Sequence, residues 1–144
     1  MGTATVRWLS GKKFIGTDST NHSVVLSTPD EGVGMKPSEL LLVALASCTA
    51  VDVVEILHKK RIELTSLEIS AAGEQQADPP WTFRKIHLTY RMRGKGLTAD
   101  AAELAVRLSE EKYCSVAATV RATAEISTEI VILPLGEPEA LPAG

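Results

Sequence analysis

The sequence has little of what a nucleic-acid-binding surface requires. Aromatic residues make up only 4% of the 144 residues, which argues against a surface that stacks bases. Basic residues do not outnumber acidic ones, and the formal net charge is −3, so no general basic surface is expected. We therefore expect no binding of nucleic acid.

Cysteine is also scarce, because Cys48 and Cys114 are the only two. They lie 66 residues apart and do not form a Cys-x-x-Cys pair. The three histidines, His22, His58 and His87, form no ligand cluster in the sequence. A metal site is therefore not expected.

No segment of the sequence has the pattern that is typical of a membrane span or a secretory signal. The first seven residues lack the apolar stretch of a signal peptide. The apolar run at residues 40–46 is too short to span a bilayer, and Asp52, Glu55 and Lys59 soon follow it. We expect a cytoplasmic protein that does not enter the membrane. In that compartment a structural disulfide is not expected, while a transient catalytic one stays open.

The fractions of hydrophobic and charged residues are typical of one compact domain. Hydrophobic residues make up 44% of the chain and charged residues 23%, enough for a core of its own. No repeat or internal boundary divides residues 1–133, which we expect to form a single domain. Residues 134–144 carry three prolines and two glycines and are expected to form a loosely held tail.

The first part of the chain predicts three strands and a long helix. Alternation and β-branched residues favour strands at 3–9, 12–17 and 23–27, paired as an antiparallel meander. Pro37 suits the first turn of a helix, and Glu39 favours the positive end of its dipole. We expect that helix to run from Pro37 to about Lys60.

The first half of this helix is apolar on all sides. Such a helix must be enclosed on every side, which is demanding for one small domain. A second copy of the chain that covers the same helix would meet the requirement. The sequence therefore predicts a homodimer.

The second part of the chain predicts two strands, two helices and a last strand. The strands are expected at 64–73 and 81–92, the second with one core face and one wet face. Thr98 is the expected N-cap of a helix that ends near Lys112. A shorter helix at 115–122 and a strand at 125–133 follow. The fold class is α+β, in the order β-β-β-α-β-β-α-α-β.

The cysteines allow two interpretations when taken on their own. Cys48 lies in the middle of a helix, with Asp52 and Glu55 on the same face, so a cation that favours its thiolate must come from elsewhere. Cys114 would lie at the N-terminal edge of a helix, which favours a thiolate. Each cysteine either packs as a small hydrophobic residue or belongs to a redox pair.

Two motifs resemble those of the OsmC/Ohr family of thiol peroxidases, and in particular its OsmC-like branch. The first is Lys-Pro-Ser-Glu-Leu-Leu-Leu at residues 36–42, followed by Ala-Ser-Cys-Thr-Ala at 46–50. The second is Tyr-Cys-Ser-Val at residues 113–116. The order of the predicted elements agrees with the family over nearly the whole chain.

The resemblance implies an OsmC-like fold and an intertwined homodimer with the cysteine-bearing helices buried at its centre. It implies an enzyme of oxidative-stress defence, a thiol-dependent reductase of organic hydroperoxides. Cys48 would form a sulfenic acid, and Cys114 would condense with it to a disulfide that an external dithiol reduces. The resemblance also assigns a catalytic glutamate, for which Glu39 is the candidate. Neither a metal nor an organic cofactor is required.

The sequence departs from the family at two positions. Ser38 stands where characterised members carry a glutamate directly after the proline. Phe14 falls near the position of the family's arginine, with Lys12 and Lys13 close by. These departures favour a second hypothesis, a non-enzymatic protein that binds a small molecule on the same scaffold. A redox sensor or partner-binding protein is a third hypothesis, although no exposed apolar stripe or charge block in the sequence points to a partner.

Overall fold

The computed structural model describes residues 2–136, and the statements below refer to these residues. Most of the predicted tail at 134–144 therefore lies outside the described part of the chain. Contacts divide the chain into two compact units, Met1–Val43 and Ala44–Gly144. The predicted single domain over residues 1–133 is not tested by this division and stays a prediction.

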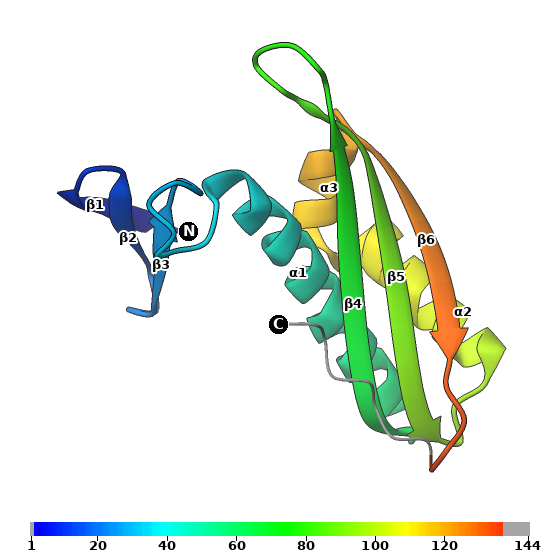
Figure 1. Ribbon diagram of the computed structural model, residues 1–144. Coiled ribbons are helices and arrows are strands. Elements are labelled where there is room, and N and C mark those ends of the chain that lie inside the picture. Colours follow the sequence, from blue (N-terminus) through cyan, green and yellow to red (C-terminus); the bar gives the residue numbers. More distant parts are fainter. Residues whose placement is uncertain (1, 137–144) are drawn as a thin grey trace. The chain divides into compact units, whose positions relative to one another are not determined.

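The first unit contains a three-stranded antiparallel sheet. Strands β1 (Ala4–Ser10), β2 (Lys13–Asp18) and β3 (Ser23–Ser27) lie side by side in chain order (Figure 1). The meander predicted from the β-branched residues is confirmed.

A loop after β3 packs closely on that strand. Leu26 forms a parallel bridge with Met35, and a Cβ at Gly34 would lie 2.8 Å from the backbone of Leu26. Residue 34 therefore has to be glycine, because any side chain there would meet the neighbouring strand.

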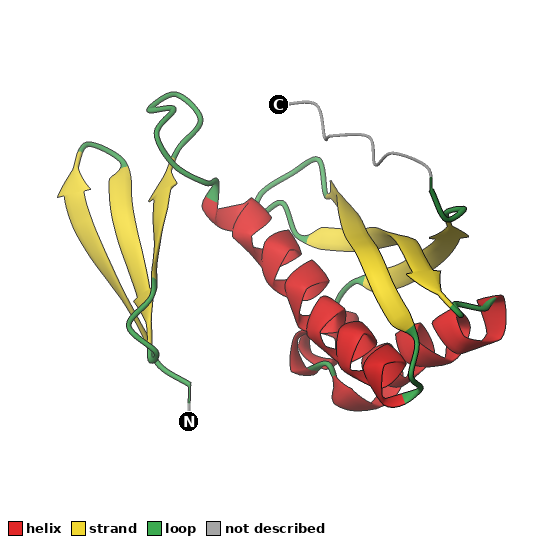
Figure 2. Ribbon diagram, turned by 90° about the horizontal axis from the view of Figure 1, so that it is seen from below, coloured by secondary structure: helices red, strands yellow, loops and turns green. Residues whose placement is uncertain are grey.

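The second unit contains a mixed three-stranded sheet. Strands β4 (Glu63–Gln75) and β5 (Phe83–Lys95) form an antiparallel hairpin, and β6 (Glu125–Ile132) pairs parallel with β5. A parallel pair needs a crossover connection. Here the connection consists of α2 (Ala99–Leu108), a π-helical turn (Ser109–Tyr113) and α3 (Ser115–Arg121). These segments and the part of α1 from Ala44 onward cover one face of the sheet (Figure 2).

The core of the second unit lies between this sheet and its helices. Strand β5 turns alternate residues into it, as the sequence predicted: Ile86, Leu88, Tyr90 and Met92 are buried. The helices and the turns after them contribute the residues that face these side chains: Leu45, Val53, Leu57, Ala102, Ala105, Val106, Cys114 and Ala117. The order of elements agrees with the predicted α+β fold.

Helix α1 (Pro37–Lys59) follows the predicted bounds closely. By length and composition the whole helix could cross a membrane, although the run at 40–46 alone could not. From Ala44 onward, however, one face is buried in the second unit, through Leu45, Thr49, Val53 and Leu57. This half of α1 is therefore a core helix.

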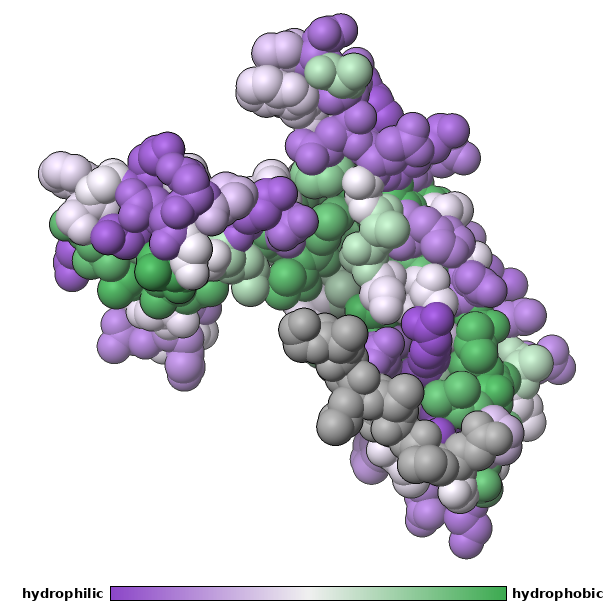
Figure 3. Space-filling model, in the orientation of Figure 1, coloured by the Kyte–Doolittle hydropathy of each residue, from purple (hydrophilic) through white to green (hydrophobic). Residues whose placement is uncertain are grey.

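The opposite face of α1 is apolar and uncovered. Val51 is 66% exposed and Val54 is 47% exposed. Hydrophobic residues reach the surface over α1 in the view of Figure 3. Within residues 44–136, the second unit does not enclose its part of this helix on all sides.

The helix predicted to end near Lys112 consists of two parts. The α-helix α2 ends at Leu108, and a π-helical turn continues it to Tyr113. Its beginning is confirmed, because Oγ1 of Thr98 accepts a hydrogen bond from the N–H of Ala101 over 3.2 Å. In the π-helical turn the N–H of Cys114 donates to the carbonyl of Ser109 over 2.7 Å. The wider turn changes the direction of the chain just before Cys114.

Candidate functional site

The two cysteines meet in the second unit. Cys48 lies near the middle of α1 and is half-buried, and Cys114 is buried between the π-helical turn and α3. Both are free thiols, and they lie close enough for Cys48 to raise the pKa of Cys114. The fold thus places side by side two thiols that are 66 residues apart in the sequence.

Cys114 is held by backbone groups on both sides. Its own N–H closes the π-helical turn, and its Sγ accepts a hydrogen bond from the N–H of Ala117 over 3.3 Å. Cys114 is therefore the N-cap of α3, at the helix edge where the sequence placed it.

The expected effect of this position on Cys114 is present but is outweighed. Burial, followed by the neighbouring Cys48 thiol, raises the pKa of the Cys114 thiol to about 11. The hydrogen bond from Ala117 acts in the opposite direction but is the weaker influence. The thiol, which is only 2% exposed, is consequently protonated at neutral pH.

A buried hydrogen bond links the segments that carry the cysteines. Ser109 is fully buried, and its Oγ donates to Oδ2 of Asp52 over 2.8 Å. Asp52 lies one turn after Cys48 on α1, and Ser109 begins the π-helical turn that leads to Cys114. The bond fixes one segment against the other close to the thiol pair.

Sequence reasoning missed a polar network beside the thiols. Tyr90 is fully buried on β5, and its hydroxyl donates to Oε1 of Glu110 over 3.3 Å, while Thr49 of α1 lies near enough to lower the pKa of Tyr90. Tyr90 also lies within electrostatic range of Cys114. A tyrosine on the predicted core face signals that a buried hydroxyl needs a partner, but the sequence did not identify that partner.

Burial governs the electrostatics of this network. It raises the pKa of Tyr90 and also raises the pKa of Glu110. The Tyr90 hydroxyl and the charge of Arg121 lower the pKa of Glu110, but less than burial raises it. Glu110 is therefore a carboxyl group that holds its proton more tightly than an exposed glutamate does.

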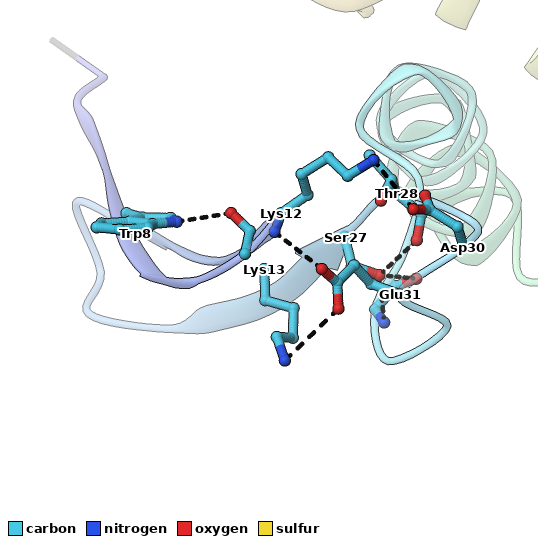
Figure 4. Close-up of polar contacts among 9 residues, drawn as sticks. Trp8, Lys12, Lys13, Ser27, Thr28, Asp30 and Glu31 are labelled. Carbon is cyan, nitrogen blue, oxygen red and sulfur yellow. Dashed lines mark hydrogen bonds and ion pairs between the residues drawn. The ribbon is translucent and has the colours of Figure 1, made fainter.

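The candidate residues of the first unit make other contacts. Glu39 lies in the first turn of α1 and pairs with Lys36 at 3.7 Å. Lys12 pairs with Asp30 at 3.0 Å and Lys13 with Glu31 at 3.5 Å (Figure 4). The two lysines near the position of the family's arginine thus tie the loop after β3 to β2. The catalytic role of Glu39 stays a prediction.

A cavity of about 510 Å³ lies between α1 and α2 in the second unit. Its apolar wall consists of Ile56, Leu104 and Leu108. Asp52, which lies one turn after Cys48 on α1, and Tyr113, which directly precedes Cys114, also line it. Its remaining lining residues are charged: Glu55, Lys59 and Lys60. Glu55 and Lys59 pair at 3.2 Å, as their spacing on the predicted helix suggested.

Histidine, cysteine and acidic side chains do not gather into a metal-binding group within residues 2–136. The chemistry that the site offers is that of two thiols beside a buried tyrosine and a carboxyl group.

Comparison with known proteins identifies the family. Protein YhfA of Escherichia coli K12 is 35% identical over 114 residues, which cover 79% of this chain and 85% of YhfA. A hypothetical protein from Aquifex aeolicus VF5 has a similar crystal structure, with a TM-score of 0.80 and 33% identity over 93% of this chain and 98% of that one.

A more distant structure shares the fold. The organic hydroperoxide resistance protein OhrB of Bacillus subtilis has a TM-score of 0.62 and 19% identity, over 90% of this chain and 97% of that one. The family model described as OsmC-like protein matches residues 29–129, a span that includes both cysteines, Tyr90 and Glu110. The chain belongs to the OsmC-like protein family.

Proposed function

We propose that this protein is a cysteine-based peroxidase that reduces organic hydroperoxides, with Cys48 as the attacking residue and Cys114 as the resolving one. The observation that carries this proposal is that two free thiols from distant parts of the sequence lie in one site, close enough for Cys48 to raise the pKa of Cys114. The family supports it, because it includes OhrB, which is named for organic hydroperoxide resistance.

The order of attack follows from the surroundings of the two sulfurs. Cys48 is half-buried, whereas Cys114 is buried and stays protonated at neutral pH. The more accessible sulfur of Cys48 therefore meets the peroxide first. A thiolate is the nucleophile in this step.

The proposed cycle has three balanced steps. The Cys48 thiolate attacks the terminal peroxide oxygen; an S–O bond forms, the O–O bond breaks, and the alkoxide takes a proton from water to become an alcohol. The sulfur of Cys114 then attacks the Cys48 sulfenic acid; an S–S bond forms, and the hydroxide that leaves combines with the Cys114 proton to give water. An external dithiol reduces the disulfide by exchange and becomes a disulfide itself.

The cavity between α1 and α2 supports an organic rather than an inorganic peroxide. Its wall of Ile56, Leu104 and Leu108 is apolar, and its lining includes Asp52, one helical turn after Cys48, and Tyr113, next to Cys114 in the sequence. An apolar tail buried there would add about 25 cal/mol per Å² of covered surface, which hydrogen peroxide cannot gain.

The uncovered face of α1 supports a homodimer as the working form. Val51 and Val54 expose apolar surface on a helix whose other face is already core. A second copy that covers this face would bring the helices that carry Cys48 to the centre of the assembly. We further propose that the dimer works in the cytoplasm, where dithiol reductants are available.

A thiol count tests the peroxidase. Reduced protein is mixed with a small excess of cumene hydroperoxide, and free thiols are titrated while the alcohol product is measured. Loss of both thiols with one alcohol formed per disulfide is expected. In Cys114→Ser a dimedone-reactive sulfenic acid should accumulate, and Cys48→Ser should form none. A wild-type protein whose thiols both stay titratable would contradict the proposal.

Binding without catalysis is the second candidate, favoured by the cavity and by Ser38 at the position of the family's glutamate. Native mass spectrometry of protein purified from its own host should then show a reproducible bound small molecule. The Cys48→Ser variant should in that case leave the peroxide resistance of the host unchanged.

A further inference from the structure

One residue, Ser109, binds both of the segments that carry the thiols. Its carbonyl oxygen accepts a hydrogen bond from the N–H of Cys114 over 2.7 Å, which closes the π-helical turn. Its hydroxyl donates to Oδ2 of Asp52 on α1 over 2.8 Å. Asp52 lies four residues after Cys48, on the same face of the helix. Two hydrogen bonds and one turn of α1 thus connect the backbone of one cysteine to that of the other.

Cys114 is bound on its other side by the helix that follows. Its Sγ accepts a hydrogen bond from the N–H of Ala117 over 3.3 Å, and its carbonyl oxygen accepts one from the N–H of Ala118 over 3.1 Å. The sulfur is therefore held in a fixed relation to the π-helical turn and the start of α3. A shift of this turn along α1 would carry the sulfur of Cys114 with it and change its distance from Cys48.

The bond between Ser109 and Asp52 is suited to resist such a shift. Ser109 is fully buried, so its hydroxyl depends on a protein acceptor, and an ionised carboxylate is a strong one. The hydroxyl of Thr49, which is also fully buried, bonds instead to the carbonyl of Ala46 in its own helix, over 3.1 Å. A bond of that kind shapes one helix, whereas the bond of Ser109 fixes two elements against each other.

We propose that Ser109 and Asp52 are positioning residues for disulfide formation, and that their hydrogen bond holds Cys114 where its sulfur can attack Cys48. In this step the S–S bond forms, the S–O bond of the Cys48 sulfenic acid breaks, and the hydroxide that leaves combines with the Cys114 proton to give water. Ser109 and Asp52 form no bond to sulfur. They contribute by keeping the two reacting groups close and aligned, which removes the need for a search.

A disulfide probe isolates the step that these residues serve. Their role rests on the proposed peroxidase function, yet this probe reports on Cys114 even if hydroperoxides fail to react. One equivalent of 2,2′-dipyridyl disulfide is added to the reduced protein, and Cys48 displaces the first thiopyridone. Cys114 then attacks the mixed disulfide and releases the second. The absorbance of the second phase gives the rate at which Cys114 attacks.

Ser109→Ala removes the donor of the bond. Its second phase should be about 10- to 100-fold slower than that of the wild type, because Cys114 is no longer held in place. The first phase, in which Cys48 alone reacts, should be unchanged. The second phase should be slower by the same factor at about pH 7 and at about pH 9, since a change in the pKa of Cys114 would instead shift the pH profile. Thr119→Ala is the control, because its hydroxyl bonds within α3, to the carbonyl of Ser115 over 2.8 Å.

Asp52 provides the matched variants on α1. Asp52→Ala removes the acceptor and should slow the second phase as much as Ser109→Ala does. Asp52→Asn keeps an oxygen that can accept the bond and should retain most of the wild-type rate. Because the two residues act through one bond, the double variant Ser109→Ala/Asp52→Ala should be no slower than either single variant.

A folded Ser109→Ala protein with the second phase of the wild type would overturn the positioning role and leave the bond a contribution to stability alone. Effects that multiply in the double variant, or an Asp52→Asn protein as slow as Asp52→Ala, would overturn it equally. If Ser109→Ala does not fold, Asp52→Ala decides, because Asp52 is only half-buried.

The same probe separates this role from the peroxidase itself. Slow second phases in the variants, combined with a wild-type protein that does not react with hydroperoxides, would disprove the peroxidase and leave the positioning role established.

Discussion

The hydroxyl of Ser109 donates a hydrogen bond to Oδ2 of Asp52 over 2.8 Å, and this bond joins the π-helical turn before Cys114 to the helix that carries Cys48. The two residues are 57 positions apart in the sequence. Ser109 is fully buried, so its hydroxyl depends on Asp52 for a partner. The bond therefore holds together the two segments that carry the thiols, although neither cysteine takes part in it.

Ser109→Ala should lower the free energy of unfolding by about 1–3 kcal/mol, because the carboxylate of Asp52 loses its buried partner. Asp52→Asn should be milder, since its amide oxygen can still accept the bond. Urea unfolding of the reduced proteins measures both. A Ser109→Ala protein as stable as the wild type would show that the bond contributes nothing.

Cys114 should resist alkylation in the folded protein. With its pKa near 11 rather than 9.0, its thiolate fraction at neutral pH is about 100-fold smaller than that of an ordinary thiol, and burial hinders the reagent further. Iodoacetamide labelling at pH 8, followed by mass spectrometry, should modify Cys48 first. In urea both cysteines should react equally fast, which serves as the control.

Glu110→Gln should make the protein more stable at neutral pH. The pKa of Glu110 is raised in the folded state, so its contribution to stability is fully present below the unfolded value of 4.5 and is lost as the pH rises through the folded value. Glutamine keeps an oxygen for Tyr90 and carries no charge. Urea unfolding between about pH 4 and about pH 8 should show a flatter profile for E110Q than for the wild type.

Glu111→Gln is the control for this stability profile, since its side chain is exposed. It should follow the wild-type curve. A parallel fall of stability with pH in E110Q and the wild type would assign the effect to another group.

Val51→Glu should weaken self-association by about 100-fold, because a charge would be buried in an apolar contact. Val51 is 66% exposed in one chain, so the variant should fold normally. Sedimentation velocity across a concentration series measures the change. Thr119→Glu adds the same charge on an exposed position of α3 and should associate as the wild type does. Equal association of both variants would place the interface elsewhere.

The order of elements could be predicted because local signals determine it. Alternating residues in β5, Pro37 at the start of α1 and the Thr98 cap at the start of α2 each act within a few residues of the chain. The cysteine pair was predicted only through the resemblance of two motifs. The spacing of the two cysteines in the sequence was also compatible with two side chains that only pack in the core.

The π-helical turn could not be predicted, because a contact across the fold favours it. Residues 109–113 contain nothing that forbids a regular helix, and the bond of Ser109 to Asp52 comes from another element. The raised pKa of Cys114 could not be predicted for a similar reason. A helix N-terminus is visible in the sequence, whereas the burial that outweighs it arises only when the chain folds.

The closeness of Cys48 and Cys114 has a consequence for the proposed cycle under severe oxidant stress. A sulfenic acid that waits for its partner is exposed to a second peroxide, which converts it irreversibly to a sulfinic acid. Here the partner thiol lies near enough to Cys48 for each to feel the other. If the protein works as proposed, the vulnerable intermediate should be short-lived, and turnover should continue at peroxide concentrations that inactivate enzymes whose cysteines must first move together.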